Sequence, residues 1–199
     1  MKPSPLIAIV GASGVGKTSL ARALAQATEL NLGLEQHAER PFQSLFKNDK
    51  RYGLANQIDY LLLRAEQERE LRAGQCPGLV DGGLDQDFHG FTRLFHAHGS
   101  LSDPEFELCR RFYDFIRATL PAPDLVIHLV APAPVIRDRL AQRERINIAS
   151  ADDISAIDGY LTDWLHAESG IKSIRIDAGL LSPDYHEILP EIIAQIKRL

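Results

Sequence analysis

The most constraining feature of the sequence is a glycine-rich stretch near the N-terminus, Gly11-Ala12-Ser13-Gly14-Val15-Gly16-Lys17-Thr18. It matches the pattern G-x-x-x-x-G-K-[ST], in which glycines let the backbone curl so that successive N–H groups point at phosphate oxygens. A short apolar run, Leu6 to Val10, precedes the stretch, and a helical pattern follows it to about Thr28. This strand–loop–helix context is the one in which the pattern binds a nucleoside triphosphate. The sequence therefore predicts a nucleotide site.

Two side chains of this loop have distinct chemical roles. The Lys17 ammonium is expected to reach the β- and γ-phosphates, and the Thr18 hydroxyl is expected to ligate magnesium. The positive end of the following helix would face the same anion. We therefore expect the nucleotide to contact Gly11, Ala12, Ser13, Gly14, Val15, Gly16, Lys17, Thr18 and Ser19.

Short apolar runs alternate with helical patterns along the rest of the chain. Strands are expected at 6–10, 30–34, 78–81, 125–130 and 173–176, and helices at 51–73, 85–98, 103–116 and 134–143 and in the tail from Asp184. Such alternation is typical of a parallel sheet covered on both faces. The sequence predicts an α/β three-layer sandwich with a five-stranded parallel sheet flanked by helices, in one domain over residues 1–199.

Composition excludes several classes of protein. With 199 residues, 45% hydrophobic and 25% charged, the chain resembles an ordinary globular domain and not a disordered, collagenous or coiled-coil protein. The net charge of -5 gives no overall basic field for nucleic acid or anionic lipid. No window approaches the length of a transmembrane helix, and the two cysteines favour a reducing compartment. We therefore expect a soluble, cytoplasmic protein without nucleic-acid or membrane partners, and we interpret His96 and His98, the closest pair of its seven histidines, as surface residues.

Beyond the loop, the order of short motifs resembles that of the deoxynucleoside kinase family over most of the chain. The matching residues are Glu35, Arg40-Pro41-Phe42, Asp49, Arg51-Tyr52, Gln57, Arg64, Asp81, Asp87, Phe91, Gly99, Leu101, Glu105, Pro123 to Ile127, and Arg143-Glu144-Arg145. The resemblance implies a fold of the P-loop kinase type. It also implies transfer of the γ-phosphoryl group of ATP, with Mg²⁺, to the 5′-hydroxyl of a deoxynucleoside. A homodimer is implied as well.

The resemblance assigns roles on the acceptor side. Glu35, just after the second expected strand, would be the general base for the 5′-hydroxyl. Gln57 would form a paired hydrogen bond to the base, and Arg64, two helical turns later on the same face, would support that pocket. Asp87 would lie near the base with Phe91 against its ring. Phe46 stands where many members carry a tyrosine that meets the sugar.

Other implied roles concern the phosphates and the donor base. Asp81 ends the third expected strand and would hold magnesium together with Thr18. An arginine-bearing lid around 139–150 would close over the transferred phosphate, with Arg143 and Arg145 as its catalytic side chains. A solvated basic helix face is the competing interpretation of these arginines. The loop at Asp177 would border the adenine.

The chain also departs from the family pattern. Asp81-Gly82-Gly83 stands where the family has Asp-Arg-Ser or Glu-Arg-Ser, so an arginine from elsewhere, such as Arg64 or one in the lid, would have to substitute. Asn56 stands where a base-stacking phenylalanine is common. Two alternatives therefore stay open: a kinase of a nucleoside monophosphate or another small metabolite, and a nucleotide-binding protein without catalysis.

Overall fold

The structure is a computed structural model, and it describes residues 3–34, 40–141 and 153–199. Its centre is one five-stranded sheet with the order β2-β3-β1-β4-β5, and every neighbouring pair is parallel. The strands are β1 (Leu6–Val10), β2 (Asn31–Gly33), β3 (Gly78–Asp81), β4 (Leu125–Val130) and β5 (Ser173–Asp177). The predicted parallel sheet is confirmed. The sequence revealed it because β1 and β3, and all but the last residue of β4, are buried, which requires continuous apolar runs.

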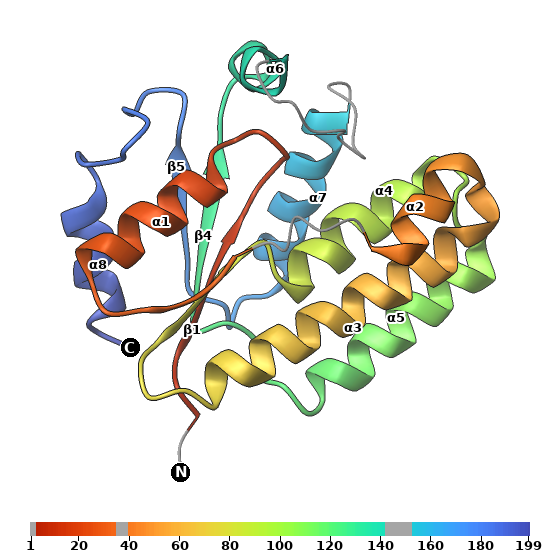
Figure 1. Ribbon diagram of the computed structural model, residues 1–199, viewed down its shortest axis with the longest axis horizontal. Helices are drawn as coiled ribbons and strands as arrows, with labels where there is room; N and C mark the ends of the chain where they lie inside the picture. The colour runs from red at the N-terminus through yellow and green to blue at the C-terminus, as the bar shows by residue number, and fades with distance from the viewer. Residues whose placement is uncertain (1–2, 35–39, 142–152) are drawn as a thin grey trace.

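Helices cover both faces of the sheet (Figure 1). They are α1 (Lys17–Ala27), α2 (Pro41–Asn48), η1 (Lys50–Tyr52), α3 (Gly53–Arg72), η2 (Gln86–Thr92), α4 (Arg93–Ala97), α5 (Asp103–Arg117), α6 (Ala133–Ala141), α7 (Ile154–Ala167) and α8 (Leu189–Ile196). Of the described helices, none is long and apolar enough to cross a membrane.

The two faces of the sheet bury different side chains. Leu20 and Leu24 of α1 and Ile192 of α8 pack on one face, together with Ile7 and Ile9 of β1. The alternate residues of β1, Leu6, Ala8 and Val10, pack on the other face against α4 and α7. A further apolar cluster joins α3, η2 and α5 outside this layer. The three-layer sandwich predicted from the sequence is therefore confirmed.

Several elements differ from the sequence predictions. Helices α2 and α7 were not predicted, and the last helix begins at Leu189 and not at Asp184. The predicted helix over 85–98 is a π-helix, η2, followed by the short α-helix α4. π-helical turns are rare and occur frequently at functional sites. The start of α5 agrees with the sequence, because the Ser102 hydroxyl and N–H both donate to Glu105 Oε2, at 2.7 Å each.

A buried ionic network joins α3, η2 and α5 below the end of β3. Arg117 donates from Nη1 to Glu68 Oε2 at 2.8 Å and from Nη2 to Asp85 Oδ2 at 2.8 Å. The Glu68 and Asp85 side chains are only 1% and 3% exposed. Glu68 Oε1 also accepts the Leu84 N–H at 3.1 Å. The network therefore fixes the chain immediately after Asp81, where the candidate site begins.

Two histidines to which the sequence assigned no role, His128 and His89, are largely withdrawn from solvent. His128 lies on β4, is 2% exposed and has Nε2 3.0 Å from an Asp158 carboxylate oxygen. His89 stacks on Trp164 with ring centroids 5.0 Å apart, and its Nε2 is 3.1 Å from the Tyr113 hydroxyl. Sequence position alone did not reveal these partners, because each lies more than twenty residues away along the chain.

His89 should make the stability of the protein depend on pH. Burial, with help from the charges of Arg93 and Arg117, lowers its pKa to about 3. The unfolded chain protonates this histidine near its ordinary pKa of about 6.5, so the stabilisation is complete above that pH and is lost as the pH falls toward 3. Between pH 6.5 and 5 this should cost about 2 kcal/mol of unfolding free energy.

The measurement is urea unfolding of the wild type and of His89→Phe across this pH range. The phenylalanine keeps an aromatic ring against Trp164 but cannot titrate, so its unfolding free energy should fall less steeply with pH. Parallel pH profiles for the two proteins would show that His89 does not contribute.

Candidate active site

The phosphate loop lies between β1 and α1, at the carboxyl end of the central strands. Gly11 has φ 146°, and a Cβ placed there would lie 2.3 Å from the Leu129 carbonyl oxygen, so no larger residue fits. Gly14 and Gly16 also have positive φ, at 85° and 116°. Helix α1 begins at Lys17, which directs its N-terminal N–H groups into the loop. The backbone therefore has the form of an anion-binding cradle.

Three side chains meet at this cradle. Lys17 is buried, and its Nζ donates to the Gly11 and Ala12 carbonyl oxygens at 2.9 and 3.2 Å. The Thr18 hydroxyl donates to Asp81 Oδ2 at the end of β3. Asp81 is 1% exposed, and among the described residues its Oδ1 has no hydrogen-bond partner. A carboxylate oxygen and a hydroxyl side by side are ligands that suit Mg²⁺, so these residues fit that ion.

Other contacts hold the loop from the side of β5. Arg139 on α6 donates from Nη1 to the Val15 carbonyl oxygen at 2.8 Å and from Nη2 to the Ala178 carbonyl oxygen at 2.9 Å. The Tyr185 hydroxyl donates to the Gly16 carbonyl oxygen at 3.3 Å, from a residue whose φ of 58° is unusual for a bulky side chain. Arg139 belongs to the stretch around 139–150 in which the sequence predicts an arginine-bearing lid, although no contact with the phosphate loop was predicted for it. Nothing in the sequence pattern marks Tyr185.

The remaining predicted donor-side residues lie around the cradle. Ala12 and Val15 are buried, Ser13 is half-buried, and Ser19 is exposed on the first turn of α1. Asp177 is exposed at the end of β5, where its Oδ1 accepts the Gly179 N–H at 2.8 Å. Asp177 therefore shapes the loop next to Ala178, the residue that Arg139 connects to the phosphate loop.

A second polar cluster lies between α3 and η2 and contains three of the residues predicted to bind the acceptor. Arg64 Nε donates to Asp87 Oδ2 at 2.7 Å, and Gln57 Nε2 donates to the Asp87 carbonyl oxygen at 3.1 Å. All three residues are at most 5% exposed. The seven-residue spacing of Gln57 and Arg64 predicted a shared helix face, and both side chains do reach the same residue. The bond to Asp87 uses one of the two N–H groups of the Gln57 amide.

Arg64 also approaches the position where the family arginine is missing. Its Nη1 lies 3.4 Å from the Asp81 carbonyl oxygen, and its Nη2 would lie 3.5 Å from a Cβ placed on Gly82. A guanidinium group from α3 is therefore present beside Gly82.

The two predicted aromatic residues lie beside the same phenylalanine, Phe95. Phe46 of α2 contacts Phe95 edge-on, with ring centroids 5.1 Å apart, and Phe91 of η2 lies 6.4 Å from the same ring. Both are half-buried and pack against the α3–η2–α5 cluster. Glu35, Arg143 and Arg145 lie outside the described residues, as does the predicted lid beyond residue 141.

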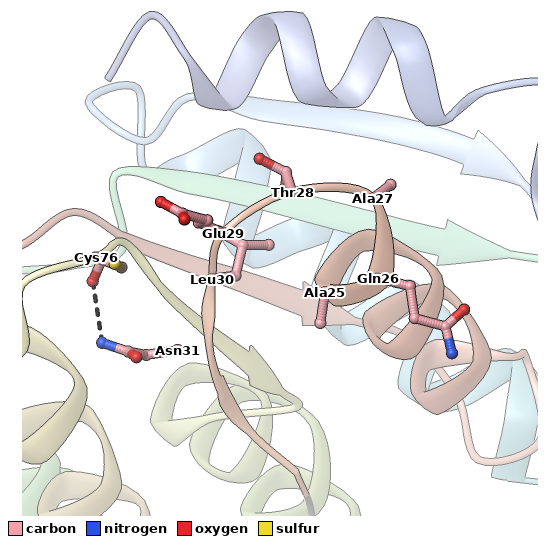
Figure 2. A pocket seen from close by; sticks show the side chains of 8 residues that line it. All are labelled: Ala25, Gln26, Ala27, Thr28, Glu29, Leu30, Asn31 and Cys76. Carbon is pink, nitrogen blue, oxygen red and sulfur yellow. Dashed lines mark hydrogen bonds between the residues drawn. The ribbon is translucent and has the colours of Figure 1, made fainter.

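A shallow hollow elsewhere on the molecule does not belong to this site. Figure 2 shows it at the C-terminal end of α1, lined by Ala25, Gln26, Ala27, Thr28, Glu29, Leu30, Asn31 and Cys76. The Asn31 amide donates to the Cys76 carbonyl oxygen there at 3.3 Å. The phosphate loop is at the opposite end of the same helix.

The chain is similar to known proteins in sequence and in fold. The family model described as "Deoxynucleoside kinase" matches residues 7–196. A deoxyguanosine kinase of Bacillus subtilis (strain 168) is 27% identical over 151 residues, which cover 73% of this chain and 70% of the relative. A deoxyadenosine/deoxycytidine kinase of the same organism is 24% identical over 143 residues, covering 70% of this chain and 66% of the relative.

Solved structures show the same fold. The structure of a deoxyadenosine kinase from M. mycoides, with products dCMP and a flexible dCDP bound, has a TM-score of 0.81 at 18% identity. The similarity covers 98% of this chain and 100% of that one. A structure of the same enzyme with bound dCTP has a TM-score of 0.79.

These findings favour the prediction of a deoxynucleoside kinase over the two alternatives, a kinase of a nucleoside monophosphate or another small metabolite and a nucleotide-binding protein without catalysis. The family model spans nearly the whole chain, and the curated relatives are named as kinases. The chain belongs to the deoxynucleoside kinase family.

Proposed function

We propose that this kinase transfers the γ-phosphoryl group of ATP to the 5′-hydroxyl of a deoxynucleoside. One observation carries the proposal: two polar clusters lie at the same edge of the sheet and are joined by the short segment from Asp81 to Asp87. One cluster, around Lys17, has the form of a phosphate site. The other, around Arg64, is a buried amide, guanidinium and carboxylate group of the kind that reads a nucleobase edge.

On the donor side, the loop from Gly11 to Ser19 would hold the phosphates, and Lys17 would turn from the Gly11 and Ala12 carbonyls to the β- and γ-phosphates. Thr18 and Asp81 would hold Mg²⁺, which supplies charge neutralisation at the phosphates when it is bound. Asp177 would border the adenine.

On the acceptor side, Gln57, Arg64 and Asp87 would hold the base, and Phe46 and Phe91 would form the apolar wall beside it. Arg64 would also supply cationic charge beside Gly82, where the family arginine is missing.

Glu35 would be the general base that accepts the proton of the 5′-hydroxyl. It follows Leu34, directly after β2, and Gly33 of β2 pairs with Val80, the residue before Asp81. Leu34 therefore leaves β2 at the edge of the sheet that carries the phosphate site. Arg143 and Arg145 would stabilise the charge of the transferred phosphoryl group.

The test is a product assay with ATP, Mg²⁺ and each of the four deoxynucleosides. We expect a 5′-monophosphate from at least one of them. Asp81→Asn, which keeps the side-chain shape but removes the charge, should reduce its yield steeply. Transfer confined to nucleoside monophosphates or to other alcohols would contradict the proposal, as would ATP binding without transfer to any acceptor.

We also propose that the protein is a homodimer and acts in the cytoplasm. Helices α3 and α5 are neighbours (Figure 1), and they expose Leu62, Leu108 and Phe115, the last of which is 71% exposed. Such apolar groups are typical of an interface. Sedimentation as a monomer would contradict the dimer. The free thiols Cys76 and Cys109 support a reducing compartment.

A further inference from the structure

Gln86 connects the phosphate-loop cluster around Lys17 with the cluster around Arg64. The sequence patterns described above assign it to neither. It is the first residue of η2 and is 3% exposed. Its Oε1 accepts the N–H of Gly11, the first residue of the phosphate loop, at 2.9 Å. The next residue, Asp87, holds Arg64 and Gln57. The π-helix thus presents consecutive side chains to the phosphate loop and to the acceptor cluster.

The bond to Gly11 fixes the orientation of the Gln86 amide. A backbone N–H can only donate, so the atom that faces Gly11 has to be Oε1, and Nε2 has to point the other way. Nε2 lies over Gly82, where an added Cβ would be 3.3 Å from it. Gly82 has φ 90° and no side chain, which leaves room for the amide at this point.

Within the part of the chain that the structure describes, the hydrogen bond of the Gln86 side chain is the one to Gly11. Nε2 is not among the side-chain atoms that are both closed off from solvent and unpaired, so it is open to solvent and accessible to a bound group. Gly82 directly follows Asp81, and its N–H donates to the Ile9 carbonyl oxygen of β1 at 2.9 Å. Nε2 therefore points at the junction between the phosphate loop, the Asp81 carboxylate and the acceptor cluster.

We propose that Gln86 is a further catalytic residue, whose Nε2 donates a hydrogen bond to an oxygen at the point of transfer while its Oε1 holds Gly11. The oxygen belongs either to the transferred phosphoryl group or to the hydroxyl group that receives it. Both oxygens can accept a hydrogen bond. The inference rests on the proposed function. The bond between the γ-phosphorus and the ADP oxygen breaks, the bond to the acceptor oxygen forms, and the proton of the acceptor hydroxyl goes to the general base of the proposed function, so that Gln86 neither gains nor loses a proton.

The two ends of the amide can be tested separately. Gln86→Glu keeps an oxygen that accepts the Gly11 N–H but removes the Nε2 donors. It should lower kcat by roughly 10²-fold and leave the dissociation constant for ATP within about threefold of the wild type. Gln86→Met removes both ends, so it should lower kcat similarly and weaken ATP binding as well. If the effect of Gln86→Glu came only from repulsion between the new carboxylate and the phosphates, the variant would bind ATP more weakly than the wild type.

The matched control is Gln26→Glu, the same exchange at an exposed position in the hollow of Figure 2, which should change neither quantity. Thermal unfolding establishes that each variant is folded. If the wild type is active and Gln86→Glu keeps kcat within about threefold, the role of Gln86 is overturned while the proposed function stands. If the wild type phosphorylates no deoxynucleoside, the proposed function fails and the role of Gln86 fails with it.

Discussion

Replacing Lys17 by methionine should lower kcat/KM for phosphoryl transfer by roughly 10³-fold while the protein stays folded. The Lys17 ammonium lies in the concave side of the phosphate loop, where its Nζ contacts the Gly11 and Ala12 carbonyl oxygens. Methionine fills the same space without the charge, so the phosphates would lose a buried cation while the side chain still packs in the loop. Initial rates over a range of ATP concentrations give kcat and KM separately.

The control for this experiment is Lys197→Met, near the C-terminus and exposed after α8, which should leave the rates unchanged. A Lys17→Met protein with unaltered melting temperature and a rate within threefold of the wild type would show that the loop does not hold the transferred phosphate.

Replacing Arg117 by methionine should lower the unfolding free energy by about 3–5 kcal/mol. The guanidinium contacts two carboxylates, Glu68 and Asp85, that are nearly inaccessible to water. Removing the guanidinium leaves both carboxylates buried without a cationic partner. The cost of these two unpaired buried charges is larger than the net stabilisation that the ion pairs provide. Urea unfolding at neutral pH measures the change.

Arg110 provides a matched control on the same helix. It also pairs with two carboxylates, Glu107 and Asp114, but all three side chains are about half exposed. Because water already solvates these charges, Arg110→Met should cause no measurable loss. Equal losses for the two variants would mean that the Arg117 network contributes no more than a surface ion pair.

The fold was predictable from the sequence where burial leaves a simple pattern. Strands β1, β3 and β4 appear as apolar runs because both faces of the sheet are covered. Helix α2 was missed because it is only eight residues long and none of its residues is fully buried, although Phe42, Leu45 and Phe46 recur at helical spacing. The π-helix could not be predicted, because its wider turn departs from the 3.6-residue period and is held by partners remote in sequence, Gly11 among them.

The same distinction applies to the candidate site. Lys17 and Thr18 were identified because the loop is contiguous in sequence, and Gln57 and Arg64 because helical spacing places them on one face. Gln86 was not identified from the sequence, because Gly11, the residue that orients its side chain, lies 75 positions away. Tyr185 lies 169 positions from Gly16, and no local pattern connects the two.

The π-helix η2 restricts how a protein of this kind can change in evolution. Deleting one residue between Gln86 and Thr92 would rotate the two sides of this turn against each other by about 100°. Gln86 and Asp87 could then no longer reach Gly11 and Arg64 while Phe91 kept its place beside Phe95. We therefore expect an insertion or deletion in this stretch to break at least one of these contacts, whereas an exchange of side chains on a backbone of the same length leaves their spacing intact.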